Sequence, residues 1–105
     1  MDIKKYLNDN YDLAEIQDIA NGALIGGVSG FIYYSETIAF YERHEAEIWQ
    51  ILEEDAHNMG ISISKILDGF SNPIEDLTGF KNSLCWYAVE RSAQEIQETF
   101  WERTA

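Results

Sequence analysis

The segment from about Ser35 to Asn58 constrains the fold most, because its apolar residues repeat with the period of an α-helix. At about 100° per residue, its main apolar residues fall within about 40° of one another and form a stripe that needs burial. These residues are Tyr41, Ile48, Leu52 and Met59. Ser35 or Thr37 can cap the start of this helix, and Gly60 can end it. The segment therefore predicts a long amphipathic helix.

A second long helix is predicted from about Phe80 to Arg103. Its apolar stripe consists of Cys85, Val89, Ile96 and Phe100. Shorter helices are expected near the N-terminus, with the second of them at about residues 12–20, and again at about residues 62–68. Asn72-Pro73-Ile74-Glu75 has the pattern of a helix start, and Gly79 is expected to end that element after one short turn.

Residues 22–30 hold four of the seven glycines of the chain. Runs of β-type residues flank Gly26-Gly27, so a tight hairpin is one interpretation, and an irregular loop between helices is equally good. The predicted fold is therefore mainly α. We expect a single acidic helical domain over residues 1–105, with two long helices, several short helices and at most one small β-hairpin.

Charge restricts the ligands of this chain. Its 105 residues include 19 acidic and 7 basic side chains, which gives a formal net charge of −12. Direct contact with nucleic acid or with an anionic membrane needs Lys and Arg, so neither is expected. No apolar run approaches the ~18 residues of a transmembrane helix, and no signal peptide is visible. A single cysteine fits a reducing cytosol.

No group of residues predicts chemistry. Glu53, Glu54 and His57 have helical contact spacing, but a metal site in a helical bundle needs such a motif on facing helices. Cys85 lies on an apolar stripe, which is typical of core packing. The glycine-rich run lacks the Gly-Lys-Ser/Thr ending of a phosphate-binding loop. We therefore predict no catalytic residue, no cofactor, no metal and no enzymatic activity.

Acidic residues gather in the first long helix. Between Glu36 and His57 there are seven acidic residues and one basic residue, so this segment carries −6 of the net charge. Such a face usually keeps a protein soluble, but it can also present a negative stripe to a basic groove. The residues predicted to contact a partner are Glu36, Glu42, Glu47, Glu53 and Glu54.

Four residues depart from the simple stripes. His44 and Glu45 project into the apolar arc of the first long helix, so either this helix overhangs the core or the pair makes a polar contact. Trp86 lies at the edge of the second stripe and Trp101 lies outside it. These tryptophans either anchor a protein partner or cover the N-terminal helices.

The stretch from Gly26 to Thr37, GGVSGFIYYSET, is the most distinctive of the chain. Together with the acidic helix after it and LCWYAVE at residues 84–90, it resembles a family of small acidic proteins of bacteriophages and mobile elements with unassigned function. The resemblance implies a bacterial host cytoplasm and inhibition of host defence, as by anti-CRISPR and anti-restriction proteins. It supplies no catalytic residues.

The resulting functional hypothesis is a non-enzymatic inhibitor of a host defence nuclease. Its acidic helix would bind a basic, nucleic-acid-binding surface of that nuclease. The alternative is a structural or regulatory accessory protein, such as a homodimeric adaptor, whose acidity only confers solubility.

Overall fold

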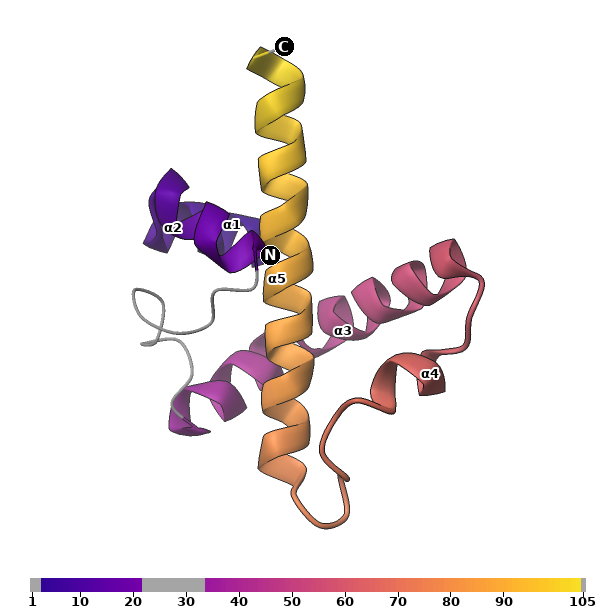
Figure 1. Cartoon of the computed structure of the whole chain (residues 1–105). Helices are drawn as coiled ribbons and strands as arrows, with labels where there is room; N and C mark the ends of the chain where they lie inside the picture. The colour runs from indigo at the N-terminus through magenta and orange to yellow at the C-terminus, as the bar shows by residue number, and fades with distance from the viewer. Residues whose placement is uncertain (1–2, 22–33, 105) are drawn as a thin grey trace.

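The computed structural model describes residues 3–21 and 34–104, with side chains for residues 3–21 and 38–99. The regular secondary structure of these residues is helical (Figure 1). The helices are α1 (Ile3–Asn10), α2 (Leu13–Ala20), α3 (Tyr34–Met59), α4 (Ile63–Leu67) and α5 (Leu77–Thr104). The prediction of a mainly α fold with two long helices is confirmed. The hairpin or loop expected at residues 22–30 lies outside the described residues.

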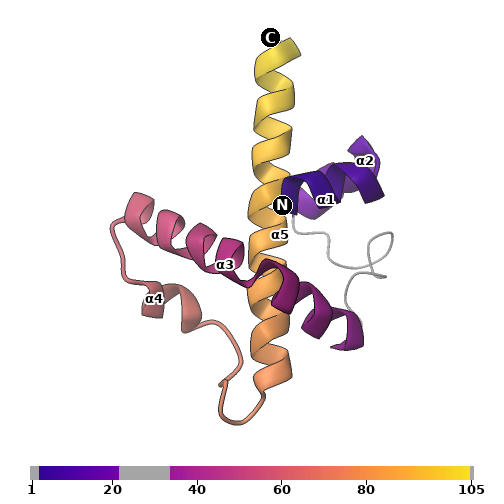
Figure 2. The same ribbon diagram turned by 180° about the vertical axis from the view of Figure 1, so that it is seen from behind.

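Helix α5 is the axis around which the other helices pack. Figures 1 and 2 show α3 crossing α5, while α1 and α2 lie beside a stretch of α5 nearer its C-terminal end. Helices α1, α2 and α3 all contact α5, and α4 packs against α3. The long helix predicted from the clearest apolar stripe is therefore not the centre of the fold.

The buried residues of α5 explain its central position. They are Leu84, Cys85, Trp86, Ala88, Val89, Ser92 and Ala93. These residues point to more than one side of the helix, because α3 packs on one side and the N-terminal helices pack on another. Trp86 belongs to this core, so it does not form a surface anchor, whereas the side chain of Trp101 lies outside the described ones.

Local capping follows the sequence closely in two places. The Asp12 carboxylate accepts a hydrogen bond from the Glu15 amide (2.8 Å), and the Glu15 carboxylate accepts one from the Asp12 amide (3.1 Å), which is a capping box. At the end of α3, Gly60 adopts φ +68°. The Ile61 and Gly60 amides donate to the carbonyls of Ala56 (3.0 Å) and His57 (3.2 Å), as in a Schellman motif.

The start of α5 corrects one expectation. Asn72 opens a turn, with its side chain accepting from the Ile74 amide (2.8 Å), but α5 begins at Leu77 and continues through Gly79. The Asp76 carboxylate caps this helix by accepting a hydrogen bond from the Gly79 amide (3.0 Å). A Cβ atom at Gly79 would collide with that carboxylate. Glycine here makes room for a cap and does not stop the helix.

Candidate functional surface: the acidic side of α3

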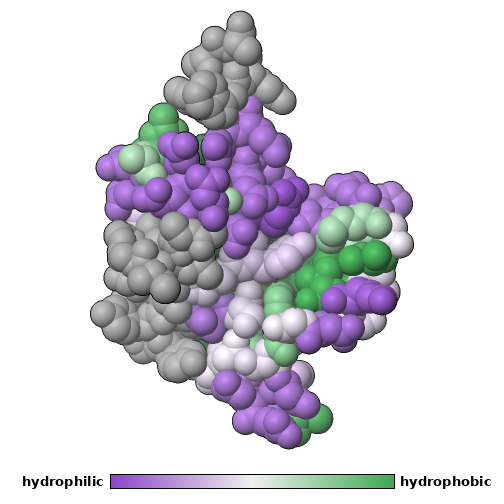
Figure 3. Space-filling model, viewed as in Figure 1, coloured by the Kyte–Doolittle hydropathy of each residue, from purple (hydrophilic) through white to green (hydrophobic). Residues whose placement is uncertain are grey.

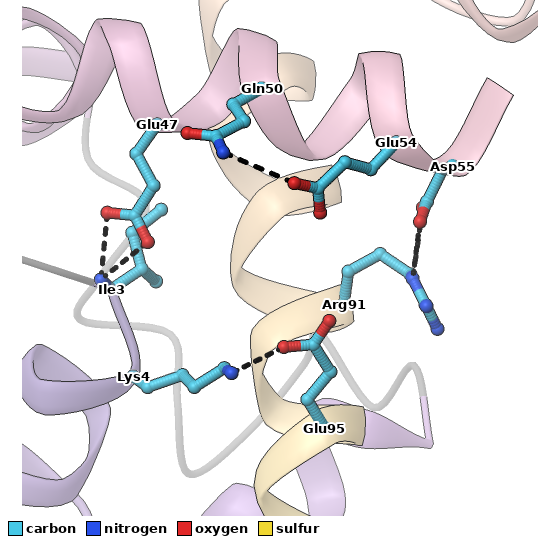
Figure 4. Close-up of polar contacts among 8 residues, drawn as sticks. All are labelled: Ile3, Lys4, Glu47, Gln50, Glu54, Asp55, Arg91 and Glu95. Carbon is cyan, nitrogen blue, oxygen red and sulfur yellow. Dashed lines mark hydrogen bonds and ion pairs between the residues drawn. The ribbon is translucent and has the colours of Figure 1, made fainter. Parts of the chain in front are cut away.

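Three of the five predicted contact residues are exposed on α3, namely Glu42, Glu53 and Glu54. Glu42 and Glu53 are eleven positions apart, so at about 100° per residue they lie within about 20° of one another on the helix. Glu54 points to a different side and accepts a hydrogen bond from Gln50 (3.2 Å; Figure 4). These carboxylates are available to a partner, and partner binding by them remains a prediction.

Glu47 has a structural role. Its carboxylate oxygens lie 3.0 and 3.1 Å from the amide nitrogen of Ile3, which donates to them (Figure 4). The first amides of a helix have no partner within the helix, so a carboxylate from α3 stabilises the start of α1. The side chain of Glu47 is 25% exposed. Glu36 lies in the first turns of α3, and its side chain is outside the described ones.

Asp55 is a second acidic residue that the fold uses internally. It is 8% exposed, and its Oδ2 atom lies 2.9 Å from Nε of Arg91 (Figure 4). The hydroxyl of Tyr87 donates to the same oxygen at 2.7 Å. Burial and the hydrogen bond to Asp55 raise the pKa of Tyr87 to about 12. This carboxylate therefore ties α3 to α5.

Further polar contacts link α5 to the N-terminal helices. Arg91 also donates to the side-chain oxygen of Gln94 (2.6 Å), and Gln94 donates to the carbonyl of Ala20 at the end of α2 (3.2 Å). Lys4 of α1 pairs with Glu95 (2.6 Å; Figure 4). Consequently, one row of polar residues on α5 contacts three other helices. These contacts were not predicted from the sequence. The available signal was Asp55, a charged residue inside the apolar arc of α3 that needs a partner when it is buried.

His44 and Glu45, which interrupt the apolar arc of α3, have different surroundings. His44 is 4% exposed, and its ring centroid lies 4.4 Å from that of Phe40 and 6.4 Å from that of Tyr6. Glu45 is exposed and accepts a hydrogen bond from the Tyr41 hydroxyl (3.3 Å). Between the two predicted alternatives, Glu45 therefore makes a polar contact, while His44 is buried with its Nδ1 atom 3.8 Å from a carboxylate oxygen of Glu47.

The Tyr41 side chain connects the acidic side of α3 to α5. Its hydroxyl accepts a hydrogen bond from the Trp49 indole (3.1 Å), and the Lys81 ammonium of α5 lies 5.2 Å from the centroid of its ring. Burial, followed by the charge of Glu45, raises the pKa of Tyr41. One end of the acidic side therefore rests on a half-buried aromatic cluster.

His57 and Cys85, considered above as a metal ligand and as a nucleophile, are respectively exposed on α3 and buried in the core. Cys85 is fully buried, as its stripe predicts, and burial raises the pKa of its thiol to about 12, so the reactive thiolate is suppressed. Among the side chains that the structure describes, residues 3–21 and 38–99, no three of His, Cys, Asp or Glu come together as metal ligands would.

None of the described helices is both long enough and apolar enough to cross a bilayer.

The fold and its surface define a class: an acidic, mainly α-helical domain in which short N-terminal helices and α3 pack on a central α5. The chain belongs to a family described as a domain of unknown function, DUF7222, whose model matches residues 1–102. A search of curated proteins and a search of solved structures find no match. The prediction that the chain belongs to a family of unassigned function is confirmed. The phage context remains a prediction.

Proposed function

We propose that this protein is a non-enzymatic inhibitor that binds a basic, nucleic-acid-binding surface of a host defence nuclease through the exposed carboxylates of α3. The observation that carries the proposal is the set of exposed carboxylates on α3 that the fold does not bury: Glu42, Glu45, Glu53 and Glu54. Two other acidic residues of the same helix, Glu47 and Asp55, are occupied by Ile3 and Arg91. The proposed contact surface is therefore narrower than the sequence alone suggested.

The spacing of these charges favours blocking of a basic surface over mimicry of DNA. From Glu42 to Glu54 the helix rises about 18 Å at about 1.5 Å per residue. Four exposed carboxylates over this distance give one charge per about 5 Å, against about 1.7 Å in duplex DNA. The acidic side of α3 is too sparse to reproduce the backbone of DNA. It suits a protein that is steered to a basic surface and then blocks it.

A matched pair of triple variants tests this proposal. Glu42→Gln/Glu53→Gln/Glu54→Gln changes the net charge from −12 to −9 on α3. Asp9→Asn/Asp18→Asn/Glu98→Gln makes the same change at exposed positions elsewhere. Glu47 stays unchanged in both variants because its loss would loosen α1.

The tagged proteins are used to capture nucleases from a bacterial host that expresses defence systems. Nucleic-acid cleavage by each retained nuclease is then measured at low and at high salt. We expect the α3 variant to lose inhibition and the control variant to keep it. Inhibition by wild type and by the control variant should weaken at high salt. Full inhibition by the α3 variant would refute the proposal.

Exposed apolar residues favour a second candidate function, an accessory or adaptor protein whose acidity only confers solubility. Met59 and Leu77 are exposed although they are large and apolar, and both lie close to α4 in the sequence. An adaptor predicts no effect on any nuclease. Sedimentation of the purified protein shows whether such an adaptor is homodimeric.

A further inference from the structure

The segment that joins α3 to α5 contributes no fully buried side chain, although Ile66, Leu67 and Phe70 pack against the core. We call residues 57–78 the arm; they comprise the last residues of α3, the connection with α4, and the first two residues of α5. No side chain of the arm is buried. The arm nevertheless has defined attachments: the Schellman motif at Gly60 sets its start, and the Phe70 ring lies 6.2 Å from the rings of both Phe80 and Tyr87. The arm is therefore held in one position while most of its surface faces outward.

Large apolar side chains concentrate on this arm. Among the side chains that the structure describes, six large apolar ones are exposed, and four of these six belong to the arm: Met59, Ile61, Ile74 and Leu77. Single exposed apolar residues are normal on a protein surface, but a concentration of them marks an interaction site. Figure 3 shows an apolar area between the C-terminal half of α3 and α4, with hydrophilic residues on either side. Ile63, half-buried at the start of α4, belongs to the same stretch of chain.

The charges of the arm indicate what can cover this area. The exposed acidic residues of the arm are Asp68, Glu75 and Asp76, of which Asp76 caps α5, whereas Lys65 is its one Lys or Arg residue. Pairing two copies of the chain here would bring together two molecules of net charge −12. Like charges placed opposite one another disfavour such a complex, and a positively charged partner is favoured.

We infer that the arm binds a basic amphipathic helix of another protein. The apolar side of that helix covers Met59, Ile61 and Ile63, and its Lys and Arg residues face the acidic residues of the arm. The flexible thioether of Met59 adapts to different apolar side chains. The inference refines the proposed function by giving the basic partner a helix, but it uses a surface other than the α3 carboxylates, so either idea can fail alone.

The test uses a synthetic probe. A fluorescently labelled peptide of Leu and Lys, with Leu at helical spacing, is titrated with the protein and followed by fluorescence anisotropy. A scrambled peptide of the same composition is the control for charge. Met59→Ser removes an apolar side chain that is 54% exposed on the arm, and Leu13→Ser removes one that is 48% exposed on α2. Circular dichroism confirms that both variants keep the helical fold.

We expect wild type to bind the amphipathic peptide more tightly than the scrambled one. Met59→Ser should weaken binding about tenfold, while Leu13→Ser leaves it unchanged. Equal binding of the two peptides would overturn the inference, because charge alone would then explain the complex. Equal losses in the two variants, or a wild-type dimer that Met59→Ser dissociates, would also overturn it.

The α3 triple variant separates this inference from the proposed function. If Glu42→Gln/Glu53→Gln/Glu54→Gln loses nuclease inhibition but still binds the amphipathic peptide at the Met59 site, both ideas are supported. If it loses peptide binding while Met59→Ser keeps it, the inference about the arm is wrong and the proposed role of α3 survives.

Discussion

Two stretches of similar length, residues 3–21 and the arm at residues 57–78, consist of short helices and turns, yet they serve the fold differently. The N-terminal stretch buries five apolar residues in the core: Ile3, Leu7, Ile16, Ile19 and Ala20. The arm buries none. Since burial of apolar area is the main stabilising term in folding, the first stretch belongs to the folded core, whereas the arm packs against it only through the partly buried Ile66, Leu67 and Phe70.

Their polar contacts differ in the same way. The N-terminal stretch is tied to distant parts of the chain through Glu47, Gln94 and Glu95. The side-chain hydrogen bonds described within the arm are local, such as the one between the hydroxyls of Ser62 and Ser64 (3.1 Å). The short helices α1 and α2 are therefore stabilised by long-range contacts of both their apolar and their polar residues. Helical propensity alone does not stabilise helices of this length.

The largest expected effect compares one apolar residue from each of the two stretches. Leu7→Ala should lower the free energy of unfolding by about 3 kcal/mol, because it leaves a cavity beside α5. Ile63→Ala, at a half-buried position of the arm, should lower it by less than about 1 kcal/mol. Urea unfolding measures both values, and similar losses would remove the distinction between the two stretches.

A smaller effect is expected for the tie between α3 and α5. Asp55→Asn removes the charge that faces Arg91, and we expect a loss of about 2 kcal/mol, below the value for a fully buried pair since the Arg91 side chain is 35% exposed. Glu53→Gln, two positions away and exposed, should change stability by less than about 0.5 kcal/mol. If the two variants unfold at the same urea concentration, the tie contributes nothing.

The cap on α1 should contribute less still. Glu47→Ala leaves the Ile3 amide without its acceptor and should lower stability by about 1 kcal/mol. Glu42→Ala, at an exposed position on the same helix, is the control. Hydrogen exchange should become faster in α1 for the first variant only. Faster exchange in the arm instead would contradict the assignment of Glu47 to α1.

A further effect is confined to alkaline pH. The pKa of Tyr87 is raised from 10.0 to about 12 in the folded protein, so the folded state holds this proton more tightly than the unfolded chain does. Its contribution to stability is therefore complete below pH 10 and is lost as pH rises towards about 12. Tyr87→Phe should remove this part of the pH dependence. Unfolding curves recorded across that interval test it, and an unchanged pH profile in the variant would contradict the role of burial and Asp55.

Much of the fold was predictable because its signals are local. The helical period of the apolar residues and the Gly60 stop each act within a few residues, and the helices they predict are present. Gly79 misled the sequence analysis because the reason for this glycine is a carboxylate three residues earlier. Local rules treat such a glycine as a stop.

The candidate surface was only partly predictable, because exposure depends on distant parts of the chain. Charge alone cannot distinguish Glu42, which is exposed, from Glu47, whose partner is the Ile3 amide 44 residues earlier. In the same way, Asp55 is buried only because Tyr87 and Arg91 lie opposite it. The arm escaped notice because Met59 falls on the apolar stripe of the first long helix, where burial was expected, whereas the structure leaves it 54% exposed.

The central position of α5 has a consequence for how the chain folds during synthesis. Helices α1, α2 and α3 all contact α5, which comes after them in the sequence. Until the stretch from Leu84 to Ala93 has left the ribosome, the apolar sides of the earlier helices lack their main partner. Stable tertiary structure must therefore wait for α5, and the nascent chain exposes apolar surface up to that moment.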